Sequence, residues 1–358
     1  MKPFSNIRIS LFRTPHTSSN ANAFGSLSPS RGKRRLVGVG VIMLAIAVLG
    51  VLEPGQVRAD TPDSAQHNAS TVARARAAFL KYMSSHRPML RSSAPPRAGS
   101  EGTTLAGSVN WSGFADVEGA STRVSSVSGQ WVIPSVQCLP GPYQYQDAFI
   151  GQWVGIDGFS DATVEQLGSA AQCFEGATYY YVWYEMYPAG TVEEGTVACI
   201  NNNVDCPQPG DHIRASVTVT SAGDYTLSLT DWTNPQESFS VTASCAPSTC
   251  VDSSAEWIVE RPAVELPFGA QILPLVDFFR TGFSNGKLTS GGKTTDIEGF
   301  QDGIVYDIAM GDDTESYWLD CVGQGRRNPQ LLQTSDPNSC PAVSPRQGSF
   351  NVTWDSSF

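Results

Sequence analysis

Ile213 to Thr220 read IRASVTVT, a stretch in which apolar and polar side chains alternate one by one. A period of two is typical of a β-strand with one buried and one solvent-facing side. Similar short runs, rich in Val, Ile, Thr, Tyr and Trp and separated by Gly, Pro, Asn and Asp, are Gly129–Ile133, Phe149–Val154, Tyr179–Tyr187, His212–Thr220, Tyr225–Trp232 and Glu256–Glu260. Many short strands at this spacing predict an all-β fold, an antiparallel β-sandwich, over residues 105–358.

The first 59 residues have the pattern of a secretory signal peptide with a long n-region. An uninterrupted apolar run, Leu36 to Leu52, follows a basic stretch that ends at Arg35. Val57 and Ala59 then place small residues at the −3 and −1 positions of a cleavage site. We therefore expect a secreted protein without stable membrane association after processing. A single membrane anchor is the alternative, since the run approaches the roughly 20 residues that span a bilayer.

Residues 60–104 are predicted to form a basic propeptide and linker. Thr71 to Met83 has helical periodicity, and Arg87 to Gly107 is rich in Pro, Ser, Arg and Gly, as in an exposed linker. A basic segment is attracted to an acidic domain near neutral pH and released as carboxyl groups protonate. We expect this propeptide to inhibit the domain that follows it. A disordered leader is the alternative from composition alone.

Charge separates this leader from the rest of the chain. Of 23 Lys and Arg and 34 Asp and Glu residues, 14 and 4 lie in residues 1–104. Residues 105–358 therefore hold 9 and 30, a net charge of about −21 against −11 for the whole chain. Nucleic-acid binding needs a basic surface, so this class of function is excluded. A domain with many carboxyl groups and few Lys and Arg residues is suited to an acidic medium, where most carboxyl groups are neutral and repel one another less. Solubility alone also explains the charge.

The eight cysteines all follow residue 137, and an even number behind a signal peptide indicates disulfides. Sequence does not fix their connectivity. Pairing in sequential order would join Cys138 to Cys173, Cys199 to Cys206, Cys245 to Cys250 and Cys321 to Cys340. No zinc-like spacing is present, so we expect neither metal nor cofactor.

Several common catalytic groups are missing from the predicted domain. His16, His67 and His86 precede it, which leaves His212 alone at the start of a predicted strand. A Ser-His-Asp triad could use only His212, and no GxSxG pattern supports one. The HExxH pattern of zinc peptidases is absent, and oxidised cysteines are poor nucleophiles. Carboxylates and carboxamides remain as the groups available for polar chemistry.

These groups concentrate in a few aromatic-rich segments. The segments are Asn110–Gly113 (NWSG), Trp153–Gly158 (WVGIDG), Val164–Gly168 (VEQLG), Trp183–Pro188 (WYEMYP) and Ala255–Glu260 (AEWIVE). In order along the chain, together with VSGQWVIP and PGD, they resemble the motifs of the glutamic peptidases. This family, also called the eqolisins, is known from fungal secreted acid proteases and occurs in bacteria too. The resemblance covers most of residues 108–300 and implies a concanavalin A-like sandwich of two large antiparallel sheets.

The resemblance also implies the site. The catalytic glutamine corresponds to Gln166 and the catalytic glutamate to Glu260. Asp157 corresponds to a supporting aspartate, Trp111 to a substrate-cleft tryptophan and Glu185 to a cleft glutamate.

Three departures from the family pattern concern the surroundings of this pair. Ala170 stands where a second aspartate is common, Tyr181 stands where an acid is expected, and the stretch from Asp157 to Gln166 is one residue shorter. The stretch from Ala309 to Cys340 is interpreted as an addition. Among the aromatic residues, we expect Trp111 to face the cleft and Trp153 to be packed in the core.

A glutamine and a glutamate suffice for peptide hydrolysis in acid. Free Glu has a pKa of about 4.3, so Glu260 could take a proton from water and return it to the leaving amine near pH 3–5. Gln166 could accept from the water and donate to the oxyanion. Glu256, Ile258 and Glu260 share one face of their strand, and strand geometry alone does not choose between the two glutamates.

The predicted function is therefore a secreted acid endopeptidase that acts on polypeptides, as a monomer. A carbohydrate-binding or glycoside-hydrolysing sandwich is the alternative, with Asp157 or Glu185 paired with Glu260. A noncatalytic extracellular domain is a third possibility.

Overall fold

The structure is a computed structural model that describes residues 62–83, 87–92, 95–98, 103–119, 121–138, 147–194, 206–221, 223–245, 250–266, 269–297, 303–311, 333–334 and 348–353. They all belong to one compact unit, residues 58–358. The predicted signal peptide, Cys199, Cys321 and Cys340 lie outside the described residues. None of the described helices is both long enough and apolar enough to cross a bilayer.

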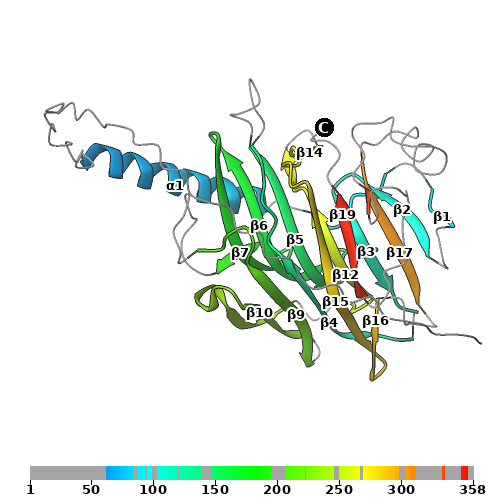
Figure 1. Ribbon diagram of the computed structural model, residues 1–358. Helices are drawn as coiled ribbons and strands as arrows, with labels where there is room; N and C mark the ends of the chain where they lie inside the picture. The colour runs from blue at the N-terminus through cyan, green and yellow to red at the C-terminus, as the bar shows by residue number, and fades with distance from the viewer. Residues whose placement is uncertain are drawn as a thin grey trace, which may run out of the picture. The chain divides into compact units, whose positions relative to one another are not determined.

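The protein is a β-sandwich of two large sheets (Figure 1). In spatial order the first sheet contains β1 (Arg97–Ala98), β2 (Thr104–Ser108), β17 (Ile304–Met310), β3 (Trp111–Val117), β12 (Ser254–Glu260), β5 (Ala148–Ile156), β6 (Val164–Phe174), β7 (Ala177–Tyr187) and β8 (Thr191–Glu194). The second contains β11 (Phe239–Ser244), β10 (Asp224–Asp231), β9 (His212–Ser221), β4 (Val124–Val132), β15 (Arg280–Ser290), β19 (Phe350–Thr353) and β18 (Gln333–Thr334), with β16 (Lys293–Asp296) also paired to β15. A separate hairpin joins β13 (Ala263–Leu266) and β14 (Gly269–Ile272).

The predicted fold class and strands are confirmed. Each of the six expected runs falls on a strand, namely β4, β5, β7, β9, β10 and β12. The pairing is antiparallel with one exception, because β17 runs parallel to β2. IRASVTVT lies in β9, where Ile213, Ala215 and Val217 are buried against the other sheet and the residues between them face outward.

The core between the sheets is formed by the apolar side of each strand. Trp257 of β12 crosses this layer and donates its indole N–H to the carbonyl oxygen of Ser128 at 2.8 Å. In the opposite direction, Trp131 of β4 donates to Ser169 Oγ of β6 at 2.9 Å. These two bonds satisfy the polar atoms of large buried rings and tie the sheets together.

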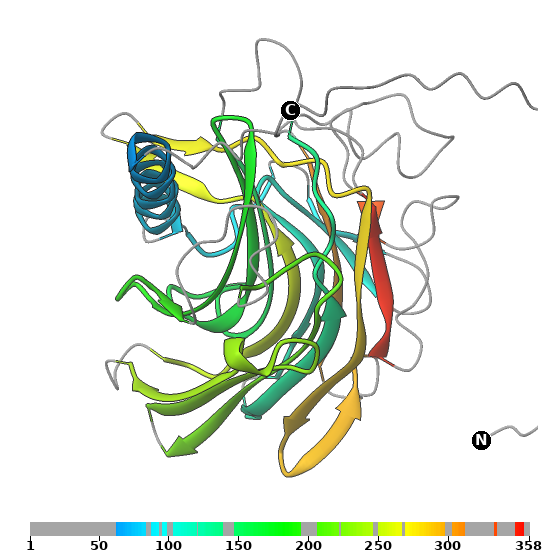
Figure 2. The same cartoon turned by 60° about the vertical axis from the view of Figure 1, so that its left-hand side comes forward.

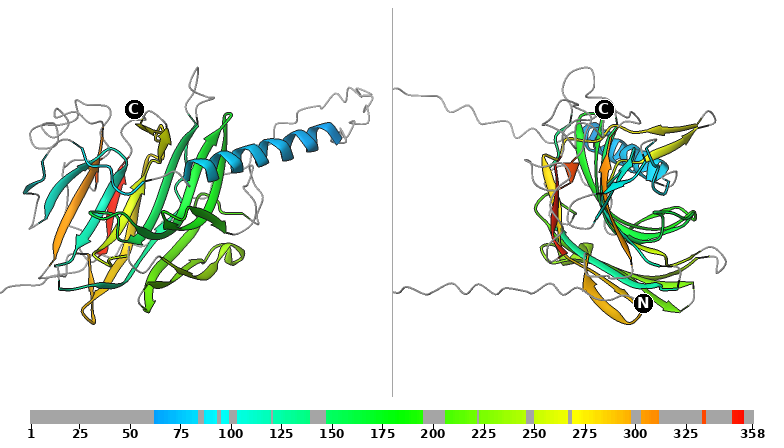
Figure 3. Two further views of the ribbon diagram at one scale, coloured as in Figure 1. Left: turned by 180° about the vertical axis from the view of Figure 1, so that it is seen from behind. Right: turned by 90° about the vertical axis from the view of Figure 1, so that its right-hand side faces the viewer.

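The other side of the first sheet carries a second apolar cluster. It includes side chains of β3, β5, β6 and β7, and it is completed by α1 (Pro62–Met83) and by Met89. Figures 2 and 3 show α1 lying beside the strands of this sheet on the side that faces away from the second sheet. The helix predicted at Thr71–Met83 is confirmed, and it begins nine residues earlier than the periodicity indicates.

Two expectations about the ends of the domain are wrong. Arg87 to Gly107 is not an exposed linker throughout, since Met89 and Ser92 are buried and Thr104–Ser108 is a strand of the first sheet. Ala309 and Met310 are not part of an addition, because they end β17 between β2 and β3 and are buried. A segment rich in Gly, Pro and Ser did not reveal the strand Thr104–Ser108, since pairing in a sheet overrides local propensity.

Two of the disulfides expected from pairing in sequential order are present. They join Cys138 to Cys173 and Cys245 to Cys250. Cys206 is also disulfide-bonded, and no described cysteine is free.

Candidate active site

The candidate residues lie on the side of the first sheet that α1 covers. β12 and β6 both pair with β5, so Glu260 stands opposite Gly151 and Gln166 stands opposite Gly155. Glu185 of β7 pairs with Gln166 on its other side. Residues two or four apart in a strand share a face, so Gln166 and Glu260 both project from this side of the sheet.

Two N–H donors hold the carboxyl group of Glu260. The indole N–H of Trp153 donates to Oε2 at 2.7 Å, and the side-chain amide of Asn110 donates to Oε1 at 3.3 Å. Glu260 is only 2% exposed. The two donors fix the orientation of the carboxyl group on the side of the sheet that carries Gln166.

Trp153 lies between Glu260 and Gln166. Its N–H reaches Glu260, while the other end of its indole lies beside Gly155. A Cβ atom at Gly155 would lie 3.0 Å from Trp153 Cζ3 and 3.1 Å from Gln166 Cβ. Glycine at position 155 therefore leaves room for the ring. Trp111 packs edge-on against Trp153, with ring centroids 4.9 Å apart.

Glu185 orients the side chain of Gln166. Gln166 Nε2 donates to Glu185 Oε2 at 2.8 Å, and Thr191 Oγ1 donates to Glu185 Oε1 at 3.0 Å. Gln166 and Glu185 are fully buried. A carboxylate accepts hydrogen bonds, so this contact fixes which side of the Gln166 carboxamide carries the nitrogen.

Asp157 binds the backbone that precedes β12. Its carboxylate accepts backbone N–H bonds from Val251, Asp252 and Ser253 at 2.6–2.8 Å. These residues directly precede β12, and Asp157 itself has a left-handed backbone with φ of 68°. Asp157 thus fixes the backbone that leads into β12, the strand that ends at Glu260.

A group of buried carboxyl groups surrounds Asp157. Burial, aided by the charges of Asp157, Asp161 and Asp252, raises the pKa of Glu165 to about 10. Burial followed by the charge of Asp157 raises the pKa of Asp161 to about 6. The pKa of Glu256 is also raised, first by burial and then by Asp157, Asp161 and Glu165. These carboxyl groups are thus held neutral in acid, unlike a group that must act as a base.

The leader covers this site. Leu90 N donates to Asn110 Oδ1 at 2.8 Å, and Asn110 Nδ2 donates to the carbonyl oxygen of Arg87 at 3.3 Å. Met89 N donates to the carbonyl oxygen of Gly158 at 3.3 Å. The chain preceding β2 therefore lies against the same Asn110 that binds Glu260.

Helix α1 extends the cover over β5, β6 and β7. Phe79 stacks on Tyr181 with ring centroids 3.9 Å apart and an interplanar angle of 6°. Arg76 Nε lies 2.5 Å from Glu193 Oε2, and Tyr82 donates to Asp147 at 3.0 Å. Tyr181, which stands where an acid is common in the resembling family, thus supplies an aromatic surface for the leader.

The sequence identified Gln166, Glu260, Glu185 and Trp111 as site residues. It did not identify the contacts that Trp153 and Asn110 make with Glu260. Trp111, expected to face the cleft, and Trp153, expected to be packed, are both fully buried in the apolar cluster on the α1 side of the first sheet, and Trp153 contacts Glu260 directly. The motif position of Asn110 next to Trp111 was a usable signal. The contact of Trp153 depends on sheet register, which sequence does not supply.

Two other chemical groupings do not form a catalytic or metal centre. His212 is exposed on β9 of the second sheet and lies on the other side of the core from Gln166. Glu165 lies near the sulfur atoms of Cys245 and Cys250, which are joined in a disulfide and cannot ligate a metal as thiolates.

Comparison with known proteins assigns the family. The family model described as the Peptidase A4 family matches residues 109–322, more than half of the chain. The chain belongs to the Peptidase A4 family. It is a peptidase of the glutamic type and acts on polypeptides.

The individual relatives are similar to this chain at low sequence identity. The chain is 28% identical over 216 residues to aspergillopepsin-2 from Aspergillus niger, covering 56% of this chain and 70% of that protein. Scytalido-glutamic peptidase with a peptide-based transition state analog matches 69% of this chain and 98% of its own, with 21% identity and a TM-score of 0.47. Aspergilloglutamic peptidase from Aspergillus niger matches 58% and 99%, with 23% identity and a TM-score of 0.39.

Proposed function

We propose that this A4 peptidase is a secreted acid endopeptidase in which Gln166 and Glu260 activate the attacking water molecule. The observation that carries the proposal is the pair of N–H bonds from Trp153 and Asn110 to Glu260, on the same side of the sheet as Gln166. A buried carboxylate held in this way is a base that needs no histidine.

The proposed reaction begins with Glu260. Its carboxylate takes a proton from water as the water oxygen attacks the carbonyl carbon of the peptide bond. Gln166 positions the water, and an N–H bond of its carboxamide stabilises the oxyanion that forms. Glu260 then returns the proton to the leaving nitrogen as the C–N bond breaks.

Glu185, Trp153 and Asp157 have supporting roles in this proposal. Glu185 holds the Gln166 carboxamide in one orientation, and Trp153 provides the surface on which water and the peptide bond meet. Asp157 acts through the backbone, by fixing residues 251–253 ahead of β12.

The test is hydrolysis of a denatured protein at about pH 3–4 by the acid-treated enzyme, beside Gln166→Ala and Gln166→Glu. Gln166→Ala should lose activity because it removes both donor and acceptor, and Gln166→Glu should lose it above about pH 5, where its carboxyl group is ionised and cannot donate. Undiminished activity in the folded Gln166→Ala variant would show that Gln166 has no such role. Inhibitors shaped for paired aspartates should have little effect.

We also propose that residues 60–104 inhibit the domain at residues 105–358 until they are removed. Apolar contacts of Phe79, Met83 and Met89 support this, together with the ion pair of Arg76 with Glu193. Protonation of carboxyl groups in acid weakens the ion pairs, whereas the apolar contacts persist. Acid therefore loosens the leader, and cleavage is needed to release it.

A synthetic peptide of residues 62–92 tests this second proposal. It should inhibit the leader-free enzyme, more strongly at about pH 5 than at about pH 3. The Phe79→Ala peptide should inhibit more weakly, while Ala77→Ser, a change at an exposed position of α1, should inhibit as well as the parent peptide. A peptide that leaves activity unchanged would overturn the assignment.

Secretion after removal of residues 1–59 fits the disulfides, which persist in oxidising compartments. We propose that the released enzyme acts as a monomer, without cofactor and without nucleic-acid or membrane partners.

A further inference from the structure

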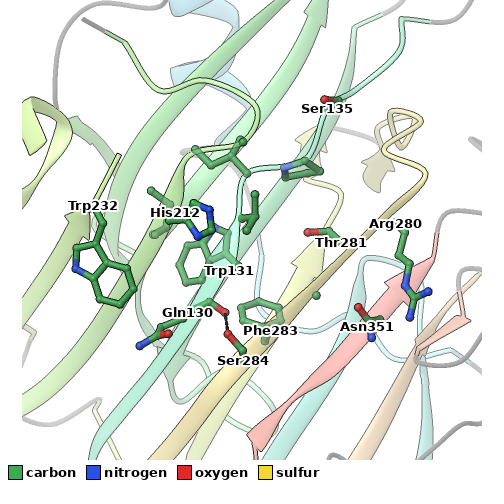
Figure 4. Close-up of a pocket in the computed structure, with 16 residues that line it drawn as sticks. Gln130, Trp131, Ser135, His212, Trp232, Arg280, Thr281, Phe283, Ser284 and Asn351 are labelled. Atoms are coloured by element: carbon green, nitrogen blue, oxygen red, sulfur yellow. Dashed lines mark hydrogen bonds between the residues drawn. The ribbon is translucent and has the colours of Figure 1, made fainter. Parts of the chain in front are cut away.

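A cavity of about 560 Å³ opens on the second sheet and plays no part in the proposed reaction. Its walls come from the ends of β4, β9, β15 and β19, and from the residues next to β9 and β10 (Figure 4). Trp131 lines it and donates to Ser169, which projects from β6 toward the core, whereas Gln166 projects from β6 to the opposite side. We call this cavity the second-sheet groove and define it by Gln130, Ser135, His212, Trp232, Arg280 and Asn351.

Trp232 distinguishes this groove from the rest of the described surface. Its side chain is 54% exposed. Trp111, Trp131, Trp153, Trp183 and Trp257, the other described tryptophans, are at most 3% exposed. Exposing an indole costs hydrophobic free energy, and a flat ring beside hydrogen-bonding groups is a surface on which another ring can stack.

The polar lining consists largely of neutral side chains. Ser135, Ser284 and Asn351 offer hydroxyl and amide groups, and Gln130 is oriented by Asn285, whose amide donates to Gln130 Oε1 at 2.8 Å. A stacking surface next to hydroxyl and carboxamide groups suits a sugar, whose ring has apolar C–H faces and a polar edge of hydroxyl groups.

The charge of the groove is opposite to that of the domain around it. Arg280 and His212 line it, and none of its sixteen lining residues is Asp or Glu, although residues 105–358 contain 30 such residues. An anionic ligand is repelled by most of this surface and attracted here. The guanidinium group of Arg280 matches a carboxylate in shape as well as in charge.

A peptide fits this groove less well than a sugar does. Extended peptides commonly bind a free sheet edge through main-chain hydrogen bonds. β4 pairs with β9 and β15, and β15 with β4 and β19, so these wall strands have partners on both sides. In Figure 4, Trp232 and Arg280 lie at opposite ends of the groove, which suits an elongated ligand.

We propose that the second-sheet groove binds an oligosaccharide that carries carboxylate groups, with a sugar ring stacked on Trp232 and a carboxylate at Arg280. The site is independent of peptide hydrolysis, and it holds the enzyme to an acidic polysaccharide while the active site remains open to polypeptides.

The test is calorimetric titration of the purified enzyme at about pH 5, where sugar carboxyl groups are ionised, with oligogalacturonate, uncharged cello-oligosaccharide and a polyglutamate peptide. Oligogalacturonate should bind. The affinity should fall about tenfold or more in Trp232→Ala and in Arg280→Ala, as expected for loss of about 1.4 kcal/mol of contact. The affinity of Arg280→Lys should lie between those of the parent and of Arg280→Ala, since lysine keeps the charge without the planar guanidinium group.

Ile304→Ala and Lys293→Ala are the matched controls, since each truncates an exposed residue outside the groove and should bind like the parent. All variants should hydrolyse peptides at the parental rate. Equal binding of the uncharged sugar would overturn the role of charge. Binding of polyglutamate alone, or of none of the three probes, would overturn the carbohydrate assignment.

Discussion

The two ends of β12 carry the same residue type on the same side of the sheet in opposite environments. At its end, Glu260 receives N–H bonds from Trp153 and Asn110. Near its start, Glu256 is fully buried, and burial together with neighbouring carboxyl groups raises its pKa. Two glutamates in such different surroundings can take different roles, one receiving N–H donors and the other buried among carboxyl groups.

The pairing register of β5 with β6 and β12 adds to this comparison. Gly155 of β5 pairs with Gln166 on one side and with Glu256 on the other, so Glu256 is the glutamate level with Gln166 across the sheet. Glu260 stands four positions along the strand, and Trp153 extends from it toward Gln166. The register thus places Glu256 nearer to Gln166, and the proposed assignment of Glu260 as the base rests on its two N–H donors.

Glu260→Gln should have the largest effect. The amide cannot accept a proton from water, so kcat should fall by on the order of 10³-fold or more, with secondary structure unchanged. Steady-state hydrolysis at about pH 4 measures the loss. Retention of activity would mean that another group supplies the base.

Gln166→Ala should have the next largest effect. Loss of one oxyanion donor typically costs about 2.7–4 kcal/mol, which corresponds to a fall in kcat of about 10²–10³-fold. KM should change much less, because the donor acts on charge that develops in the transition state. A rise in KM with unchanged kcat would instead make Gln166 a substrate-binding residue.

Asn110→Ala should reduce kcat about tenfold, since its hydrogen bond to Glu260 is long and a bond to a charged group contributes about 1.5–3 kcal/mol at most. Steady-state kinetics in acid measure the fall in kcat, and an unchanged kcat would show that this bond plays no part in catalysis. Asn285→Ala, which removes an amide on the second sheet, should keep the parental kcat.

Glu256→Gln should leave activity at about pH 4 unchanged and alter only the dependence of stability on pH. Because the folded pKa is raised, the folded protein keeps a proton that the unfolded chain loses above about pH 4.3. The contribution of Glu256 to the free energy of unfolding of the parent is therefore fully present below that pH. It decreases as the pH rises, by about 1.4 kcal/mol per pH unit for each proton retained.

Urea unfolding between about pH 4 and 7 measures this dependence. Removing Glu256 should reduce the slope by one proton, while the contributions of Glu165 and Asp161, whose pKa values are also raised, remain. An unchanged slope would show that Glu256 titrates alike in the folded and unfolded protein.

The sequence was sufficient to predict the strands and the parts of the site that lie in continuous motifs. Alternation in IRASVTVT and the order of the aromatic segments located β9, β12 and the candidates Gln166 and Glu260. It was insufficient for contacts between strands that are distant in sequence. The bond from Trp153 to Glu260 joins residues 107 positions apart, and it depends on the register of β5 with β12.

Local composition also misled where pairing decides the structure. Thr104–Ser108 contains glycine and serine in a segment that resembles a linker, yet it is a strand because β17 and β1 provide its hydrogen-bonding partners. Asn110 was read as part of a motif, whereas its contact with Glu260 follows from the pairing of β3 with β12, and its contact with Leu90 from the path of the leader.

The most direct test compares the two glutamates of β12 in one assay. Hydrolysis of a denatured protein at about pH 3–4 is measured for the leader-free parent, Glu260→Gln and Glu256→Gln, with each variant confirmed as folded. We predict that Glu256→Gln cleaves like the parent and that Glu260→Gln is inactive. Loss of activity in Glu256→Gln with activity retained in Glu260→Gln would contradict the assignment of the base.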